Sequence, residues 1–175
     1  ALKKKNKNAP KFDVENYLNS ILGVNVLAIY GLNDVGAMEI LAETGADMSK
    51  WPTVKHFVAW ANLCPNNKIT GGKLVSSKLM KKKANAASQA FRKAANACQR
   101  SDHWLGDYFR RMKAKGGNKY AIVATAHKIA TIYYKMVSEK VEFNPPDLAG
   151  YQEKRKNAKI AYLERALNAL QKDSA

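Results

Sequence analysis

A long helical pattern in the C-terminal half of the sequence constrains the fold more than any other feature. Apolar residues recur there at intervals of four, three, four and three positions, at Ile122, Ala126, Ile129, Tyr133 and Met136. A β-strand would alternate with a period of two, whereas this spacing keeps the apolar side chains on one face of an α-helix. Such a helix is stable when its apolar face packs against a core, so the segment predicts a helical protein.

Other segments show the same periodicity, and each is bounded by glycine, proline or a capping residue. Helices are expected between Asp13 and Gly23, over about 24–30, 34–44, 52–64, 84–99 and 103–115, and over about 148–172. Residues 65–82 lack a helical stripe, and their Gly-Gly pair and lysines favour a basic loop or a loose hairpin. Because strand signals are almost absent, the predicted fold class is all-α.

The same boundaries predict three parts of the chain. Residues 1–11 form a basic leader or linker, residues 12–145 form the main domain, and residues 146–175 form a tail helix after Pro145-Pro146. The apolar residues of the tail span only two heptads, which is short for a coiled coil, but they offer a surface for assembly. These residues are Ile160, Leu163, Leu167 and Leu170.

The segment from Leu27 to Leu41 has the pattern of a helix-hairpin-helix motif, expected over about 24–45. Gly31 and Gly36 would let the backbone approach a phosphate closely, and the helix that follows would present unpaired N–H groups. Such contacts bind the DNA backbone without reading its sequence. The alternative is a helix pair that packs on the core, with Gly31 ending the first helix. Asp34 disfavours a nearby phosphate.

Charge is distributed very unevenly along the chain, whose formal net charge is +16. No acidic residue occurs between Asp47 and Asp102. A merely solvated surface usually mixes both signs, so this stretch predicts a surface that binds phosphate and loses affinity as salt rises. A membrane surface fits less well, because the lysine cluster lies in a loop that contains glycine rather than on an amphipathic helix. The basic residues are Lys50, Lys55, Lys68, Lys73, Lys78, Lys81, Lys82, Lys83, Arg92, Lys93 and Arg100.

The loop within that stretch places hydroxyl groups beside paired glycines and lysines. Thr70 precedes Gly71-Gly72-Lys73, and Ser76-Ser77 precedes Lys78. One of these hydroxyls could attack a phosphodiester, with lysine stabilising the developing negative charge. The alternative is a loop that only anchors phosphate through hydroxyl donors. The spacing is not that of a P-loop, which needs an earlier glycine and a hydroxyl directly after the lysine.

Several other kinds of site are excluded or disfavoured by the sequence. Cys64 and Cys98 lack the spacing of zinc ligands, and the three histidines lie far apart. The acidic residues do not form the pattern of a two-metal nuclease site, so no cofactor is expected in this chain. His127 is expected to be a packed residue of the long helix rather than a base.

Four segments in a fixed order carry a family resemblance. They are Gly31-Leu-x-x-x-Gly, Ala46-Asp-Met-Ser-Lys-Trp-Pro-Thr-Val-Lys-His-Phe, Leu63-Cys-Pro-x-Asn-Lys-Ile-Thr-Gly-Gly-Lys, and Ala124-Thr-Ala-His-Lys-Ile-Ala before a tyrosine-rich helix end. Their order resembles the transposase domain of the DEDD insertion-sequence transposases, the bridge-RNA-guided recombinases related to the Piv DNA invertase. The resemblance covers about residues 12–145.

This resemblance implies a two-part protein. An N-terminal RuvC-like domain would hold magnesium on four acidic residues, and the C-terminal domain would supply a serine that links covalently to DNA. The family's Ser-Gly-Gly-Lys motif falls on Thr70-Gly71-Gly72-Lys73, so threonine stands at the serine position. Ser76 and Ser77 are the alternative nucleophiles. The acidic tetrad has no counterpart in the sequence, so we expect a fragment that is inactive alone.

The resemblance also implies the partners: DNA, a structured guide RNA, and further copies of the full-length protein. A bacterial cytoplasmic location close to the nucleoid is expected, with no membrane association. The rival hypothesis is a non-catalytic, basic nucleic-acid-binding protein. Under either hypothesis, the expected nucleic-acid contacts are Gly31, Gly36, Lys68, Gly71, Gly72, Lys73, Lys78, Lys81, Lys82, Lys83 and Arg92.

Overall fold

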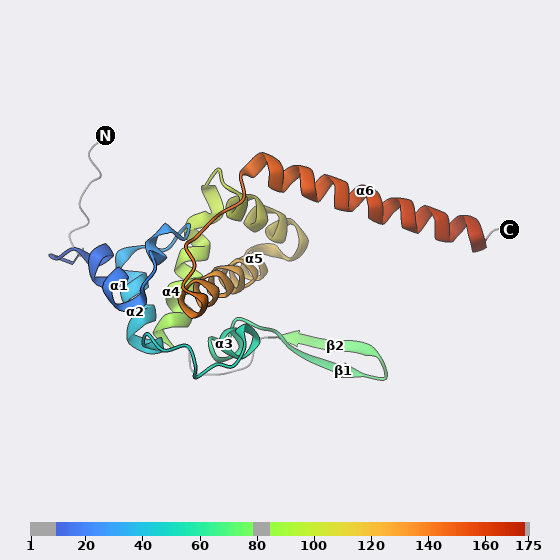
Figure 1. Ribbon diagram of the computed structural model, residues 1–175. Coiled ribbons are helices and arrows are strands. Elements are labelled where there is room, and N and C mark those ends of the chain that lie inside the picture. The colour runs from blue at the N-terminus through green and yellow to red at the C-terminus, as the bar shows by residue number, and fades with distance from the viewer. Residues whose placement is uncertain (1–9, 79–84, 174–175) are drawn as a thin grey trace. The chain divides into compact units, whose positions relative to one another are not determined.

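The computed structural model describes residues 10–78 and 85–173. The described chain is mostly helical (Figure 1). It divides into two compact units. The first unit contains the chain up to Ser101 together with 105–143, and the second contains 102–104 together with the chain from Asn144 onward. The predicted leader falls mainly outside the described residues.

The helices begin and end where local chemistry favours it. Asp13 caps the first helix by accepting a hydrogen bond from the backbone N–H of Asn16, and Gly23 ends it in the left-handed region at φ 72°. The α-helices are α1 (Val14–Leu22), α2 (Asp34–Thr44), α3 (Val54–Trp60), α4 (Ala86–Ala97), α5 (Trp104–Glu139) and α6 (Leu148–Asp173).

One helical prediction differs from the structure, and another is confirmed at Gly117. The helix expected over 24–30 is a single 3₁₀ turn, Val26–Ala28, because Asn25 caps it at once and Ile29 is already extended. Gly116-Gly117 was expected to break the helix, and this is confirmed: within α5 the backbone leaves helical geometry at Gly117, where φ is 79° and ψ is 179°. Glycine accepts this left-handed, non-helical backbone conformation, which lets the chain bend between the two helical stretches of α5.

The basic loop is a β-hairpin rather than an irregular loop. Strand β1 (Asn66–Thr70) pairs antiparallel with strand β2 (Lys73–Lys78), and Gly71-Gly72 forms the two-residue turn between them. Both glycines have positive φ, 54° and 75°, as a type I′ turn requires. The fold is therefore mostly α with one small sheet, and this hairpin corrects the all-α prediction.

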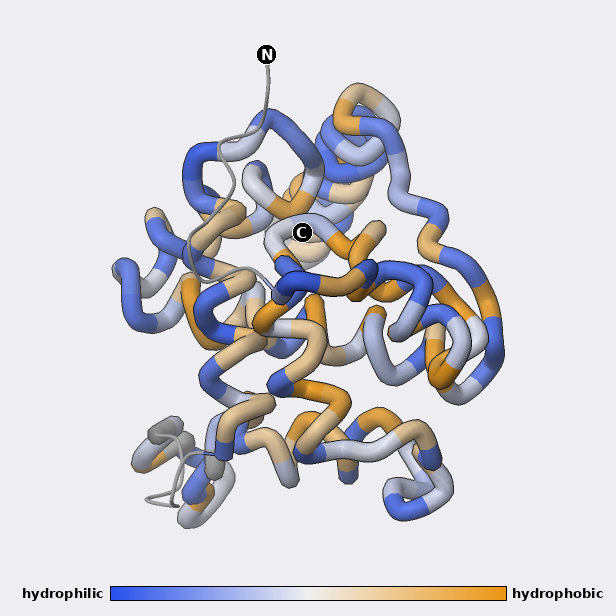
Figure 2. The backbone as a smooth tube through the Cα atoms, turned by 90° about the vertical axis from the view of Figure 1, so that its left-hand side faces the viewer, coloured by the Kyte–Doolittle hydropathy of each residue, from blue (hydrophilic) through white to orange (hydrophobic). Residues whose placement is uncertain are grey.

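The core of the first unit is aromatic. Phe57 of α3, Phe91 of α4 and Tyr133 of α5 are fully buried, and their ring centroids lie 5.8 to 6.3 Å apart. Figure 2 shows hydrophobic stretches alternating with hydrophilic ones along the chain, as amphipathic helices require. Removing such large apolar surfaces from water contributes roughly 2 kcal/mol per ring. The three rings therefore join α3, α4 and α5 in one core.

The second unit is built on α6. Within it, the rings of Trp104 and Tyr151 pack with their centroids 5.7 Å apart. Ile160, Leu163 and Leu167 of the predicted assembly surface are exposed. Among the described residues, no helix has both the length and the apolar composition needed to cross a bilayer.

Candidate nucleic-acid interface

The β-hairpin exposes most of its side chains. Ile69 is 65% exposed and Val75 is 68% exposed, although both are apolar. A Cβ atom added at Gly71 or Gly72 would have no neighbour within 4 Å. A two-stranded hairpin with so little packing is accessible to a large ligand on its surface.

The pairing register separates the three predicted hydroxyls onto two faces. Cross-strand partners project from the same face, and side chains alternate along β1. Thr70 pairs with Lys73, and Ser76 pairs with Lys68. We call this face, with Lys68, Thr70, Lys73 and Ser76, the lysine face. Ser77 pairs with Asn67 on the opposite face.

Ser77 has a defined hydrogen-bond partner. Its Oγ donates to Oδ1 of Asn67 over 2.7 Å. This bond fixes the direction of the hydroxyl and leaves the oxygen lone pairs directed away from the amide. Asn67 is an amide and cannot take the proton, so it positions Ser77 without activating it as a base would.

A pocket of about 710 Å³ lies beside Ser77, within the first unit. Of the three predicted hydroxyl residues, Ser77 lines it. Leu63 and Pro65 border it from the segment that leads into β1, and α5 supplies the other side. The remaining lining residues are Tyr108, Lys119, Tyr120, Val123, Ala124, His127 and Lys128.

His127 has one ring nitrogen engaged. Its Nδ1 lies 3.2 Å from the backbone oxygen of Leu63 and 3.6 Å from Sγ of Cys64. A carbonyl can only accept, so Nδ1 carries the proton in that bond, and Nε2 of the neutral ring keeps a lone pair. Burial raises the pKa of the Cys64 thiol, so the pair does not form a thiolate. His127 was predicted to be a packed residue of the long helix. The structure also places it in the lining of the pocket.

The kink of α5 brings two tyrosines to this pocket from the two sides of Gly117. Tyr120 is 44% exposed, and its ring lies against Gly116, where an added Cβ would come within 2.7 Å of it. The guanidinium of Arg111 lies 5.3 Å from the ring centroid of Tyr108. Bending the helix thus lets residues twelve positions apart line one pocket.

Arg92 is a predicted phosphate contact that the structure supplies with an internal partner. It is half-buried, and its Nη2 donates to the backbone oxygen of Asn62 over 3.1 Å. Asn62 lies just before the segment that enters the hairpin, so this bond helps to anchor the base of the hairpin. Contact between Arg92 and a phosphate stays a prediction.

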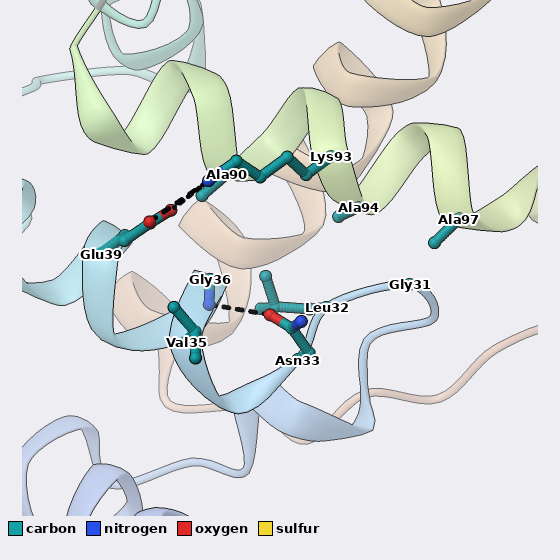
Figure 3. A pocket seen from close by; sticks show the side chains of 10 residues that line it. All are labelled: Gly31, Leu32, Asn33, Val35, Gly36, Glu39, Ala90, Lys93, Ala94 and Ala97. Atoms are coloured by element: carbon teal, nitrogen blue, oxygen red, sulfur yellow. Dashed lines mark hydrogen bonds and ion pairs between the residues drawn. The ribbon is translucent and has the colours of Figure 1, made fainter. Parts of the chain in front are cut away.

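Gly31 and Gly36 face α4 across a small pocket of about 280 Å³ (Figure 3). A Cβ at Gly31 would clash with the backbone oxygen of Ala94, and Gly36 is buried. Asn33 caps α2 by accepting from the N–H of Gly36 over 2.8 Å. The packing thus gives both glycines a structural role, and their contact with phosphate stays a prediction.

The remaining predicted lysines are only partly described. Lys68 and Lys73 are exposed on the lysine face. Lys78 ends β2, while Lys81, Lys82 and Lys83 lie outside the described residues. Across 10–78 and 85–173, no group of three or more His, Cys, Asp or Glu side chains could hold a metal ion. The magnesium site that the resemblance implies belongs to the other domain and stays an expectation.

Sequence reasoning missed the pocket. Its lining residues come from segments more than sixty positions apart in the sequence, from Leu63 to Lys128. The hydrogen bond from Ser77 to Asn67 was missed as well. A periodic pattern places residues on a helix face, but it does not tell which distant segment that face meets. The Gly116-Gly117 pair correctly predicted a break in the helix, but residue spacing did not show that the break brings residues from both sides to one pocket.

The sequence profile described as Transposase IS116/IS110/IS902 family matches residues 23–110, just over half of the 175 residues. The matched range includes the glycines at 31 and 36, the whole hairpin, and α4. A comparison with curated proteins found no match.

Proposed function

The chain belongs to the IS116/IS110/IS902 family of transposases, and on this premise we propose that its hairpin presents DNA with a hydroxyl nucleophile. The observation that carries the proposal is the position of Ser77. Its hydroxyl is oriented by Asn67 and lies at a pocket that is lined by two lysines and a histidine.

Three hydroxyls compete for this role. The family resemblance places the nucleophile at Thr70, which lies at the exposed tip of the hairpin beside Gly71. Threonine keeps the hydroxyl but adds a methyl group that restricts χ1. Ser76 is half-buried on the lysine face. We favour Ser77, because it combines a fixed hydroxyl with an adjacent cavity into which a reacting group fits.

The proposed step is a transesterification at a DNA phosphate. The hydroxyl oxygen of Ser77 forms a new bond to phosphorus, and the bond from phosphorus to one deoxyribose oxygen breaks. The serine proton passes to solvent or to Nε2 of His127, and the departing oxygen takes up a proton. The phosphodiester is conserved as a protein–DNA ester, so the step can be reversed during strand exchange.

The lysine face supports a second part of the proposal, which is binding of the DNA backbone. Lys68 and Lys73 are exposed, and neither has an ion-pair partner among the residues that the structure describes. Each ammonium that meets a phosphate releases a counterion, so the binding is expected to weaken steeply with salt. The helix-hairpin-helix contact at Gly31 and Gly36 is a weaker candidate, because Asn33 already engages one N–H at the start of α2.

We further propose that this chain acts together with a RuvC-like, magnesium-binding domain, a structured guide RNA and other copies of the protein. These partners follow from the family resemblance alone. Alone, the chain is expected to bind DNA or structured RNA without cutting it. Magnesium-dependent cleavage by the purified chain would contradict that expectation.

The experiment is a covalent trapping assay. Full-length protein, guide RNA and labelled DNA are incubated with magnesium, and adducts are mapped by mass spectrometry. We expect a DNA remnant on Ser77, and we expect Ser77→Ala to abolish the adduct while Thr70→Ala, Ser76→Ala and the distant control Ser20→Ala retain it. An adduct on Thr70 or Ser76 would reassign the nucleophile. Salt-sensitive binding with no adduct in any sample would favour the rival hypothesis of a passive nucleic-acid-binding protein.

A further inference from the structure

We infer that the pocket beside Ser77 takes one unpaired nucleobase of the DNA strand that the hairpin binds. The inference rests on the proposed function, since it names the part of the DNA that would enter this pocket. It adds a binding site formed largely by α5, whose residues have no role in the proposed chemistry apart from His127.

The size and the lining of the pocket suit a base. A volume of about 710 Å³ falls in the range of small-molecule sites and exceeds what a single nucleotide needs. Leu63, Pro65, Val123 and Ala124 supply apolar walls. A base that has left its stack loses apolar contacts on both faces, and such walls replace them.

Two tyrosines supply aromatic surfaces. The ring of Tyr120 is supported on one side by the backbone at Gly116, and almost half of its surface is exposed. A ring that is already supported loses little freedom when a base stacks on its open side. Tyr108 lines the same pocket, with the Arg111 guanidinium near its ring. Aromatic stacking of this kind is the common mode of binding unpaired bases.

The charges around the pocket suit the phosphates on either side of that base. Lys119 and Lys128 line the pocket and are exposed, and neither forms an ion pair within the described part of the chain. No aspartate or glutamate is among the lining residues. An apolar peptide would gain nothing from two unpaired ammonium groups, whereas a nucleotide strand pairs its phosphates with them.

The position of the pocket connects it with the proposed chemistry. Ser77 and His127 both line it. A base held there would fix the phosphate next to it near the hydroxyl of Ser77, which is the positioning that an attack on phosphorus needs. A base within a duplex offers no face for stacking, so the pocket favours a strand that is unpaired at that nucleotide.

The experiment compares two oligomers by fluorescence anisotropy. One is an oligothymidylate of about 12 nucleotides, a length within the range of known single-strand binding sites. The other has the same length and backbone, with every base removed. We expect the purified chain to bind the oligothymidylate about 10-fold more tightly than the abasic oligomer, the scale of one stacked base. Equal affinity for the two oligomers would overturn the inference.

Three variants assign the difference to the pocket. Tyr120→Ala is expected to remove the preference for the oligothymidylate while leaving binding of the abasic oligomer unchanged, and Tyr120→Phe is expected to retain the preference. Tyr162→Ala changes an exposed tyrosine of α6 and serves as the matched control. Circular dichroism verifies that each variant is folded. A preference that survives Tyr120→Ala would place the base elsewhere and contradict the inference.

Two further outcomes separate this inference from the proposed function. Binding of neither oligomer at low salt would contradict the DNA role itself, and the inference with it. Binding of both oligomers with equal affinity would leave the DNA role intact and remove only the base pocket.

A third measurement distinguishes DNA from RNA. If Tyr120→Ala weakens binding of an oligouridylate but not of the oligothymidylate, the pocket takes RNA, and the assignment to DNA is wrong.

Discussion

Two turns of this protein contain glycines at positive φ, and their surroundings are opposite. At Gly31, φ is 84°, and a Cβ would clash with the backbone oxygen of Ala94 and lie 2.8 Å from Sγ of Cys98. At Gly71, φ is 54°, and a Cβ would have no neighbour within 4 Å. The first turn is part of the packed helical unit, and the second is the tip of an exposed hairpin.

From the sequence, both turns were predicted to contact phosphate, because each combines glycine with polar or basic residues nearby. The structure shows two different reasons for glycine. At Gly31 it allows α4 to approach closely, whereas at Gly71 and Gly72 it permits a type I′ turn that carries lysines and hydroxyls outward. Glycine therefore serves close packing at the first turn and an exposed tight turn at the second.

The largest expected effect is a difference in the free energy of unfolding between alanine variants at the two turns. Gly31→Ala combines a left-handed backbone with a steric clash, so it should lower the free energy of unfolding by about 3 kcal/mol or more. Gly71→Ala meets only the backbone cost, about 1 kcal/mol. Thermal or urea unfolding of the two variants measures both. Equal losses would contradict the contrast between a packed turn and an open one.

A second prediction concerns DNA affinity. Replacing Lys68 and Lys73 with glutamine should weaken DNA binding by about 50-fold near 0.1 M salt and reduce the slope of log affinity against log salt by about two. The free energy of unfolding should not change, because both side chains are exposed. Lys154→Gln with Lys156→Gln, on exposed positions of α6, is the matched control. The same loss in the control pair would show that binding follows net charge rather than the hairpin.

The smallest expected effect is the pH dependence of stability at the packed turn, through Cys98. Burial raises the pKa of the Cys98 thiol from 9.0 to about 11, and Cys98 donates to the backbone oxygen of Tyr30 beside Gly31. The folded state keeps this proton longer than the unfolded state, so its stabilisation is complete below pH 9.0 and is lost as the pH rises toward about 11. One pH unit into that window should cost about 1 kcal/mol.

Cys98→Ala provides the control for the pH effect. This variant has no thiol to ionise, so its midpoint of thermal unfolding should fall less than that of the natural sequence over the same pH range. An identical fall in both proteins would mean that other groups carry the alkaline dependence.

The helical part of the fold was largely predictable, because caps and apolar periodicity are local properties. Asp13 and Gly23 bound α1 as predicted, and the long apolar stripe lies on α5. The hairpin was harder, because Ile69 and Val75 are exposed and do not alternate against a core. The Gly-Gly pair left a loose hairpin as one of two alternatives, but no apolar alternation indicated which residues pair.

The candidate site was likewise predictable only in part. The hydroxyls and lysines of the hairpin were predicted from adjacent residues, and their role is still a proposal. The Ser77–Asn67 hydrogen bond depends on the register of the hairpin, and the pocket depends on the kink at Gly117. Both are consequences of tertiary or strand-level geometry that residue spacing alone does not specify.

The central claim is that the hairpin, rather than the packed turn at Gly31, meets DNA. The most direct measurement is hydrogen exchange of the chain with and without duplex DNA, read by mass spectrometry at peptides that cover 66–78 and 31–36. The account predicts slower exchange in 66–78 on DNA binding and no change in 31–36. Slower exchange confined to 31–36, with the hairpin unaffected, would contradict it and would favour the helix-hairpin-helix contact instead.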